Sequence, residues 1–346
     1  MRAIIFRKNG GPEVLEYVTD FPEPQIADDE ALVEVKACAL NHLDIWVRQG
    51  MPALKLPLPH ISGCDTSGVI AKLGKACKQR TIGEAVVVFP GISCGECAFC
   101  ESGRDNLCNT YQILGEHAHG SLAQFVKVKE RNLFPKPKNL SFEETAAFPL
   151  TFLTAWHMLK THANIKEGQS VLVLGAGSGI GVAAIQIAKL LGAKTIIAAV
   201  SSQEKLGKVT NLGATTSLLL NPEKPGFYKE ILKATGGAGV DVIFEHVGPA
   251  TMKDSIRSLK KGGIIVTCGA TTGPEAAVDL RYFFTREIRL QGSIMGTYEE
   301  FKTILDYVNQ GKLKPVIDCV FPLDQTRQAQ EKMLSRNFFG KIVVKP

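Results

Sequence analysis

The sequence predicts an α/β protein in which a doubly wound parallel sheet is inserted into a β-rich domain. A strand, a glycine-rich turn and a helix follow one another over residues 171–191. From about residue 141, helices and strands alternate, as in a parallel sheet covered by helices. The first 130 residues and the tail instead show short strands broken by glycine and proline. A chain of 346 residues is expected to form about two domains.

The glycine-rich turn is the most informative segment for the fold. Val171–Leu174 is an apolar run of strand length, and glycines follow at positions 175, 177, 179 and 181. Val182–Leu191 has the pattern of a buried helix, and Lys194–Val200 that of a second buried strand. In such a βαβ unit, the helix N-terminus presents its unpaired N–H groups and its positive dipole end. The glycines allow close approach to the backbone at that point.

A dinucleotide pyrophosphate is the expected occupant of this turn. The pattern G-x-G-x-x-G is not matched literally, because the sixth position counted from Gly175 is Ile180. A tight turn without a ligand is therefore the alternative interpretation. The residues expected to contact the dinucleotide here are Gly177, Ser178, Gly179, Ile180 and Gly181.

The other elements follow in chain order. Five β-like runs come first, at Met1–Phe6, Val14–Val18, Ala31–Ala37, Gly68–Lys72 and Glu84–Phe89. Helices are expected at 42–49, at 141–148, where Ser141 and Glu144 fit a capping box, and at 203–212. Later strands are expected at Val240–Phe244, Gly263–Cys268 and Ile288–Gly292, and the tail Val316–Pro346 as short strands around a helix at 324–334.

Composition and charge exclude several classes of protein. Hydrophobic residues make up 45% and charged residues 21%, as is usual for a globular enzyme. No apolar run approaches the roughly 20 residues of a membrane span, and the N-terminus is too interrupted for a signal peptide, so a cytoplasmic location is expected. The net charge of +6 comes from 40 basic and 34 acidic residues without a dense basic run, so no nucleic-acid partner is expected.

Four of the nine cysteines form a metal-binding pattern. Cys94, Cys97, Cys100 and Cys108 have the spacing C-x2-C-x2-C-x7-C, which lets one loop wrap a tetrahedral ion. Four thiolates close the coordination sphere, so a structural zinc is predicted in a lobe at 91–110. An iron–sulfur cluster is the alternative, because spacing alone excludes neither. Most of the remaining cysteines are expected to be ordinary buried residues.

With these features, the sequence resembles the medium-chain dehydrogenase/reductase superfamily, which includes zinc alcohol dehydrogenases and quinone oxidoreductases. The resemblance covers essentially the whole chain. It is carried by Lys36–Trp46, Pro59–Asp65, the cysteine lobe, Gly175–Gly181 and Gly340–Val344. It implies a Rossmann domain at 151–295 inserted in a GroES-like catalytic domain at 1–150 and 296–346.

The resemblance also implies roles for residues outside the glycine turn. Residues expected along the cofactor are Thr154, Val247, Gly269, Ala270 and Lys341. Residues expected either beside the substrate or in the core are Phe152, Phe283 and Met295. A homodimer or homotetramer is expected, through apolar pairing of an edge strand near 288–295.

Departures from the zinc alcohol dehydrogenases determine the predicted mechanism. The positions that would hold a catalytic zinc and its neighbouring carboxylate are Asn41, Cys64, Leu150 and Asp65, and the hydroxyl of the proton relay is replaced by Leu43. Leu150 cannot bind a metal, and an amide is a poor zinc ligand. Asn41 and Asp44 instead match the Asn-x-x-Asp pattern of quinone oxidoreductases, which transfer hydride without an active-site metal.

Three residues are therefore predicted at the catalytic centre. The Asn41 amide is expected to polarise the substrate by hydrogen bonding. Asp44 is expected to cap or anchor the segment that enters the helix at 42–49, and Trp46 to line the substrate cleft or join the core. A rebuilt metal site is the alternative, formed by Cys64, Asp65 and one histidine among His42, His60, His117 and His119.

The choice of cofactor depends on the end of the second strand of the βαβ unit. NAD enzymes place an acidic residue there to accept from the ribose hydroxyls. Here Val200 is followed by Ser201, Ser202 and, three positions later, Lys205, which favours the 2′-phosphate of NADP(H) over NAD(H).

The sequence thus predicts an NADP(H)-dependent oxidoreductase that transfers hydride to a small molecule, a quinone or an α,β-unsaturated carbonyl compound. Alcohol–aldehyde interconversion with a reworked catalytic zinc is one alternative. A non-enzymatic RNA-binding or structural relative is the other, and the net negative charge of the cysteine lobe disfavours it.

Overall fold

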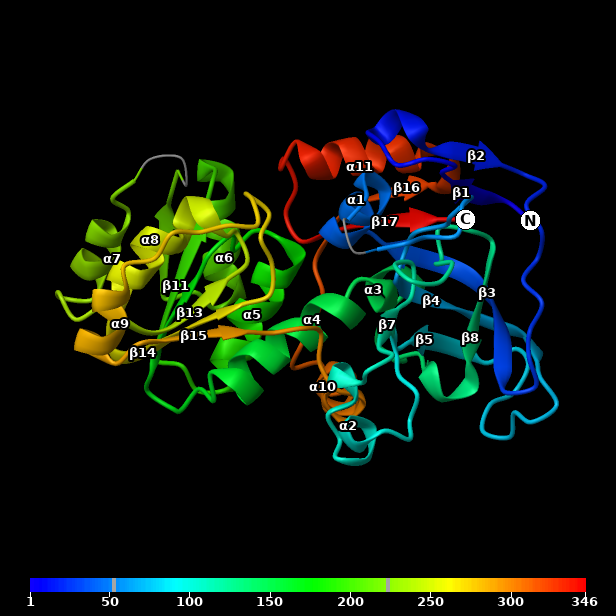
Figure 1. Cartoon of the computed structure of the whole chain (residues 1–346), viewed down its shortest axis with the longest axis horizontal. Helices are drawn as coiled ribbons and strands as arrows, with labels where there is room; N and C mark the ends of the chain where they lie inside the picture. The colour runs from blue at the N-terminus through cyan, green and yellow to red at the C-terminus, as the bar shows by residue number, and fades with distance from the viewer. Residues whose placement is uncertain (52–53, 222–224) are drawn as a thin grey trace. The chain divides into compact units, whose positions relative to one another are not determined.

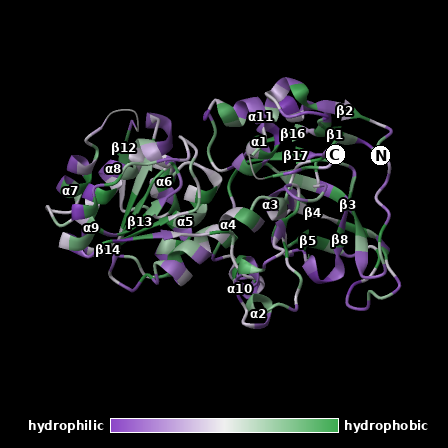
Figure 2. Cartoon of the chain, viewed as in Figure 1, coloured by the Kyte–Doolittle hydropathy of each residue, from purple (hydrophilic) through white to green (hydrophobic). Residues whose placement is uncertain are grey.

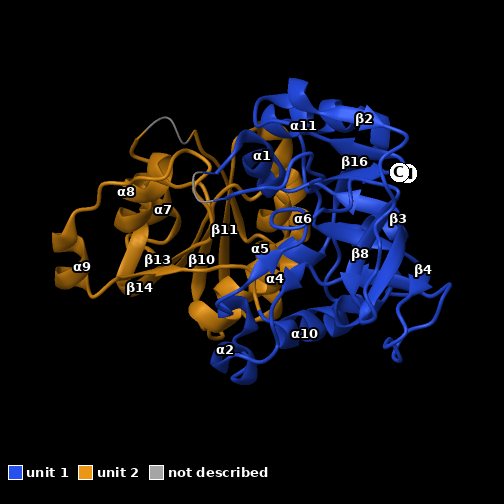
Figure 3. Ribbon diagram, turned by 45° about the vertical axis from the view of Figure 1, so that its right-hand side comes forward, with its two compact units in different colours: residues 1–150, 297–346 blue, residues 151–296 orange. Residues whose placement is uncertain are grey.

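The structure is a computed structural model that describes residues 1–51, 54–221 and 225–346 (Figure 1). The chain divides into two compact units (Figure 3). Unit 1 combines Met1–Leu150 with Thr297–Pro346, and unit 2 is Thr151–Gly296. The second boundary therefore falls one residue after the position predicted from the sequence. No helix of the described chain combines the length and hydrophobicity that crossing a bilayer requires.

Unit 2 is built on a six-stranded parallel sheet in the order β12-β11-β10-β13-β14-β15. The sequence order rises in one direction from β10 and in the other direction from β13, so β10 and β13 flank the point where the winding reverses. The strands carry continuous apolar runs because helices cover a parallel sheet on both faces, and hydrophobic colouring dominates β13 in Figure 2.

Strands and helices alternate along unit 2. Its strands are β10 (Ser170–Val173), β11 (Thr195–Val200), β12 (Thr216–Leu219), β13 (Val240–Glu245), β14 (Leu259–Thr267) and β15 (Arg289–Gly292). Its helices are α5 (Gly179–Leu190), α6 (Leu206–Leu212), α7 (Tyr228–Ala234), α8 (Pro249–Ser258) and α9 (Leu280–Arg286), and α4 (Pro149–Trp156) with the π-helical turn His157–His162 leads into it.

Unit 1 is built on a seven-stranded sheet in which β3 and β4 form the long central pair. Its path is β16-β17-β3-β4-β5-β9, and β8 also pairs with β3. The C-terminal strand β17 lies antiparallel to β3, with Val343 opposite Ala39 and Val344 opposite Cys38. This pairing brings the last residues of the chain beside the segment that enters α1.

The elements of unit 1 are mostly short. Its strands are β1 (Ala3–Ile5), β2 (Glu16–Val18), β3 (Glu30–Ala39), β4 (Asp65–Leu73), β5 (Ala85–Val88), β6 (Gly91–Ile92), β7 (Gln112–Ile113), β8 (Phe125–Lys129), β9 (Leu133–Pro135), β16 (Ile317–Pro322) and β17 (Lys341–Lys345). Its helices are α1 (His42–Gln49), α2 (Ala98–Glu101), α3 (Phe142–Ala146), α10 (Tyr298–Asn309) and α11 (Thr326–Leu334).

The predicted fold class is confirmed, with small local differences. Ser141 and Glu144 form the expected capping box, but helix α3 ends at Ala146 and α4 begins with Pro149 at its first position, where its missing N–H costs nothing. Val14 belongs to a 3-10 turn at Pro12–Val14 rather than to strand β2.

Candidate active site

The carboxyl ends of the unit 2 strands gather most of the predicted cofactor residues at one edge. Gly177–Gly181 follow β10, Ser201 and Ser202 follow β11, Val247 follows β13, and Gly269 with Ala270 follows β14. In open α/β sheets, ligands bind at this edge, beside the point where the strand order reverses. The sheet topology therefore brings together residues that are up to about 90 positions apart in the chain.

The turn after β10 requires glycine for two separate reasons. Gly175 has φ +54°, and a Cβ on it would lie 2.8 Å from the His246 ring. A Cβ on Gly181 would lie 2.6 Å from Ala176 Cα. Ser178 is the N-cap of α5, and its hydroxyl accepts a hydrogen bond from Gly181 N at 3.1 Å. The glycines thus let the chain pack tightly enough to present the N-terminus of α5.

A buried carboxylate organises the neighbouring loop, and sequence reasoning missed it. Glu245 is fully buried at the end of β13. Its carboxylate accepts from Val247 N and Gly248 N at 2.7 and 3.1 Å. It also accepts from Thr251 Oγ1 and Ser255 Oγ, at 2.9 and 3.0 Å. The signal was a glutamate four residues before the start of helix α8, where a carboxylate can accept hydrogen bonds from the N–H groups of the turn that enters the helix.

Two observations in unit 2 fit a bound dinucleotide. The glycine turn leaves room for close approach to backbone N–H groups, as above. The hydroxyl of Thr154 on α4 is buried and has no hydrogen-bond partner among the described residues. A buried polar atom without a partner is costly, so it favours a ligand that supplies one. Of the residues expected near the substrate, Phe152 and Met295 are buried and Phe283 packs against the core of unit 2.

The predicted catalytic residues of unit 1 belong to a buried polar cluster. Lys341 Nζ donates to Asn41 Oδ1 at 2.6 Å and to Asp65 Oδ2 at 2.9 Å. Asp65 Oδ1 accepts from Leu150 N at 2.7 Å. Lys341 is 4% exposed and Asp65 0% exposed, so this is an ion pair removed from solvent. Lys341, which was expected beside the cofactor, has its ammonium bound to these two side chains.

The predicted role of Asn41 as a donor to substrate is not supported by this geometry. Asn41 Nδ2 donates to Asp65 Oδ2 at 2.8 Å and also lies 3.3 Å from Cys64 Sγ and 3.4 Å from Ala39 O. An amide has two hydrogens, and both are directed at these acceptors. The reason is the Lys341 ammonium, which takes the amide oxygen and so turns the NH2 group towards Asp65.

Asp44 anchors the entry to α1, as expected for its structural role. Its carboxylate accepts from Asn41 N at 2.7 Å and from Gly63 N at 2.9 Å. It therefore ties the start of the helix to the segment before Cys64. Burial raises the pKa of Asp44 to about 6, although hydrogen bonds from these N–H groups and the charge of Lys341 oppose the shift. The Trp46 ring lies edge-on to His42, with centroids 5.1 Å apart.

The alternative metal site at Cys64 and Asp65 is not assembled. Outside residues 52–53 and 222–224, the four lobe cysteines are the only group of three or more metal-binding side chains that converge. His60 instead lies beside Gly115 O, at 3.1 Å, and His119 beside Ile61 N. Burial raises the pKa of the Cys64 thiol well above its usual value. Because the Lys341 ammonium is bound to Asp65, and an amide and a leucine stand at two of the other positions, these residues do not fit a catalytic zinc.

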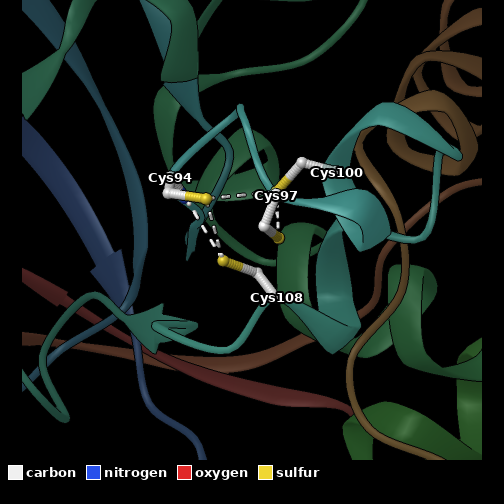
Figure 4. A group of neighbouring side chains, drawn as sticks. All are labelled: Cys94, Cys97, Cys100 and Cys108. Carbon is white, nitrogen blue, oxygen red and sulfur yellow. Dashed lines mark hydrogen bonds between the residues drawn. The ribbon is translucent and has the colours of Figure 1, made fainter.

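The four lobe cysteines do fit a tetrahedral ion (Figure 4). All their sulfur atoms lie within 4.8 Å of one another, and three of the Sγ–Sγ distances are 3.5, 3.6 and 3.8 Å. Ligands about 2.3 Å from a tetrahedral zinc would be about 3.8 Å apart. Cys94 N donates to Cys108 Sγ, and Gly95 N donates to Cys100 Sγ. The hydrogen bond from Cys94 N is the largest cause that lowers the pKa of Cys108 to about 6.

Together, the dinucleotide edge of unit 2 and the buried polar cluster and cysteine lobe of unit 1 define an oxidoreductase that uses a nicotinamide dinucleotide. Residues 27–138 match the family model described as the alcohol dehydrogenase GroES-like domain, and residues 179–310 match the one described as zinc-binding dehydrogenase. The chain belongs to the medium-chain dehydrogenase/reductase superfamily.

Similar proteins include several kinds of reductase and dehydrogenase. The chain is 33% identical to the crotonyl-CoA carboxylase/reductase of Cereibacter sphaeroides, over 96% of this chain and 83% of that protein. It is 31% identical to the NADPH-dependent alkenal/one oxidoreductase of Arabidopsis thaliana, over 100% of this chain and 80% of that protein. A crystal structure of an NAD-dependent alcohol dehydrogenase shares 45% identity and a TM-score of 0.95, with full coverage of both chains.

Proposed function

We propose that the protein reduces the conjugated double bond of an α,β-unsaturated carbonyl compound, or a quinone, with hydride from NADPH. The observation that carries the proposal is the buried polar cluster of unit 1. The Lys341 ammonium lies among Asn41, Asp65 and Cys64, where zinc-dependent relatives would need anionic ligands. A buried cation disfavours a second cation at the same place.

The chemistry divides between cofactor and chain. Reduced nicotinamide, when bound, supplies a hydride, which is two electrons and one hydrogen. In conjugate reduction the β-carbon gains that hydrogen, and the displaced electron pair collects on the carbonyl oxygen as an enolate. A solvent proton then completes the product at the α-carbon. The chain has to hold the carbonyl, exclude bulk water and stabilise the negative oxygen with hydrogen-bond donors.

A substrate screen tests the reaction. With NADPH in excess, 2-cyclohexen-1-one and 1,4-benzoquinone should be reduced, and ethanol and benzyl alcohol should not be oxidised with either oxidised cofactor. Oxidation of an alcohol that stops when a bound metal is removed would contradict the proposal.

NADPH is proposed over NADH because of the residues after β11. Ser201 and Ser202 offer hydroxyls, Lys205 follows, and no carboxylate stands at the position that repels a 2′-phosphate. The printed name of the Arabidopsis relative also specifies NADPH. Isothermal titration should give a lower Kd for NADPH than for NADH. Ser201→Asp should reverse that order, whereas Ser217→Asp, on the outer strand β12, should not.

We also propose one structural zinc per chain at Cys94, Cys97, Cys100 and Cys108. The sulfur distances given above support it. Elemental analysis of protein purified without added metal should find about one zinc per chain, and iron in its place would favour a cluster instead.

Alcohol–aldehyde interconversion with NAD is the second candidate. The 45% identity to a structure named as an NAD-dependent alcohol dehydrogenase favours it. The two candidates differ in metal content as well as in cofactor. Two zincs per chain, with activity lost on removal of the weaker one, would establish the second candidate.

The edge strand β15 supports a proposed homodimer, which could pair further into a tetramer. All four residues of β15 are exposed, and β15 has no neighbour on its outer side in the described sheet. Large apolar side chains are exposed on and around it, at Leu280, Phe284, Leu290 and Ile294. Two copies of this edge could pair across a two-fold axis and cover these side chains. A monomer by light scattering at micromolar concentration would contradict this.

A further inference from the structure

A tyrosine just beyond the cysteine lobe carries a buried hydroxyl. Tyr111 is partly buried as a residue, and its hydroxyl is buried and has no hydrogen-bond partner among the described residues. A buried tyrosine hydroxyl usually finds a hydrogen-bond partner. A buried phenol without a partner costs about 1–3 kcal/mol, so its retention calls for an explanation.

The lobe and a glycine hold this hydroxyl in place. Tyr111 N donates to Cys108 O at 2.9 Å, which fixes the residue one turn after the last lobe cysteine. Its side chain reaches back over the short sheet of β6 and β7, in which Gly91 pairs with Ile113. A Cβ on Gly91 would collide with Tyr111 Oη, so the hydroxyl occupies the space that a side chain at position 91 would fill.

The following loop packs against the residues beside Cys64. A Cβ on Gly115 would lie 2.6 Å from Gly63 O, and Ser121 N donates to Gly63 O at 2.9 Å. Burial is the first cause of a raised pKa of Tyr111, and negative charge at Asp105 and Glu116 contributes. The loop that follows Tyr111 therefore packs against the segment that carries Cys64, beside the polar cluster.

We propose that Tyr111 is a catalytic residue whose hydroxyl donates a hydrogen bond to the carbonyl oxygen of the substrate. The inference rests on the proposed function and supplies the donor that Asn41 cannot, because the Asn41 hydrogens are already bound. As hydride reaches the β-carbon, the electron pair moves to that oxygen, and the Tyr111 O–H stabilises it without giving up its proton. The substrate class is a compound with a carbonyl oxygen conjugated to the reduced carbon.

Tyr111→Phe tests the proposal because it removes only the oxygen. With NADPH and 2-cyclohexen-1-one, we expect kcat to fall about 100- to 1,000-fold, the loss typical of one oxyanion donor, with little change in KM or in the Kd of NADPH. The melting temperature should stay the same or rise, because a buried unpaired hydroxyl is lost. Tyr298→Phe is the matched control. The Tyr298 hydroxyl donates to Arg131 O at 3.1 Å, so its removal should lower stability and leave kcat unchanged.

The possible results distinguish the role of Tyr111 from the proposed reaction. An unchanged kcat in Tyr111→Phe, or a fall in kcat that accompanies a lower melting temperature, would overturn the role of Tyr111 while leaving the reaction in place. A wild-type protein that reduces neither the enone nor the quinone would overturn the proposed function and this inference with it.

Discussion

Replacing Lys341 by Met tests the buried ion pair that arranges the polar cluster. Lys341 Nζ lies 2.9 Å from Asp65 Oδ2, and the two side chains are 4% and 0% exposed. Removing one partner of a buried pair leaves the other charge uncompensated and costs about 3–5 kcal/mol. Asp65 keeps hydrogen bonds from Asn41 Nδ2 and Leu150 N, at 2.8 and 2.7 Å, which offset part of this cost. We therefore expect Lys341→Met to lower the free energy of unfolding by about 3 kcal/mol.

The same strand provides a matched control. Lys345, at the other end of β17, pairs with Glu143 at 2.6 Å, but these side chains are 50% and 24% exposed. Exposed pairs contribute about 0–1 kcal/mol, so Lys345→Met should cost no more than that. Urea unfolding of both variants and the wild type, at one pH and one ionic strength, measures the difference. Equal and small losses for the two variants would refute the reasoning.

A double-mutant cycle separates the charge interaction from side-chain packing. Asp65→Asn added to Lys341→Met removes both charges, so the double variant should lose about 1–3 kcal/mol less than the sum of the two single losses. A coupling energy near zero would mean that the two side chains do not interact across the cluster. The cluster would then have no electrostatic reason to orient Asn41.

Three further predictions concern other parts of the molecule. Burial lowers the pKa of His60 to about 4, below its usual 6.5, so its contribution to stability is complete above pH 6.5 and is lost as pH falls towards 4. That loss is about 3 kcal/mol. In His60→Gln, the free energy of unfolding should therefore decline less between pH 6.5 and pH 4 than in the wild type. An unchanged slope would contradict this prediction. Arg48 Nε donates to Gln330 Oε1 at 2.8 Å, while Arg48 Nη2 and Gln330 Nε2 are buried without partners among the described residues. Gln330→Glu would offer the guanidinium a second acceptor and its opposite charge, so we expect a gain of about 1–3 kcal/mol in urea unfolding, whereas Gln330→Met should lose stability. Cys97→Ser should remove the proposed metal, measured by elemental analysis, and lower the melting temperature; Cys319→Ser, outside the lobe, should do neither.

The order of strands and helices in unit 2 could be predicted because its signals are local. Apolar runs, the glycines of the turn after β10 and the capping box at Ser141 each act over a few residues. The cysteine lobe is local as well, since three of its four ligands lie within seven residues. The resemblance of several short motifs added Val247, Gly269 and Ala270, which follow strands that the topology brings together.

The polar cluster of unit 1 depended on long-range contacts and was only partly predicted. Asn41 and Asp65 were named as site residues or neighbours, but the sequence gives no sign that Lys341, 300 positions from Asn41, would bind them both. That contact exists because β17 pairs with β3, and it reverses the predicted use of the Asn41 amide. Tyr111 was missed as well, because one tyrosine in a loop carries no periodic signal.

The sequence by itself determined the fold class, the glycine turn and the four-cysteine lobe, because each is encoded by residues close together in the chain. Only the tertiary structure decided which hydrogen-bond donors are already bound and which are left for a ligand. The physical reason is that a buried donor must find an acceptor, and in unit 1 the competing acceptors come from strands far apart in the chain.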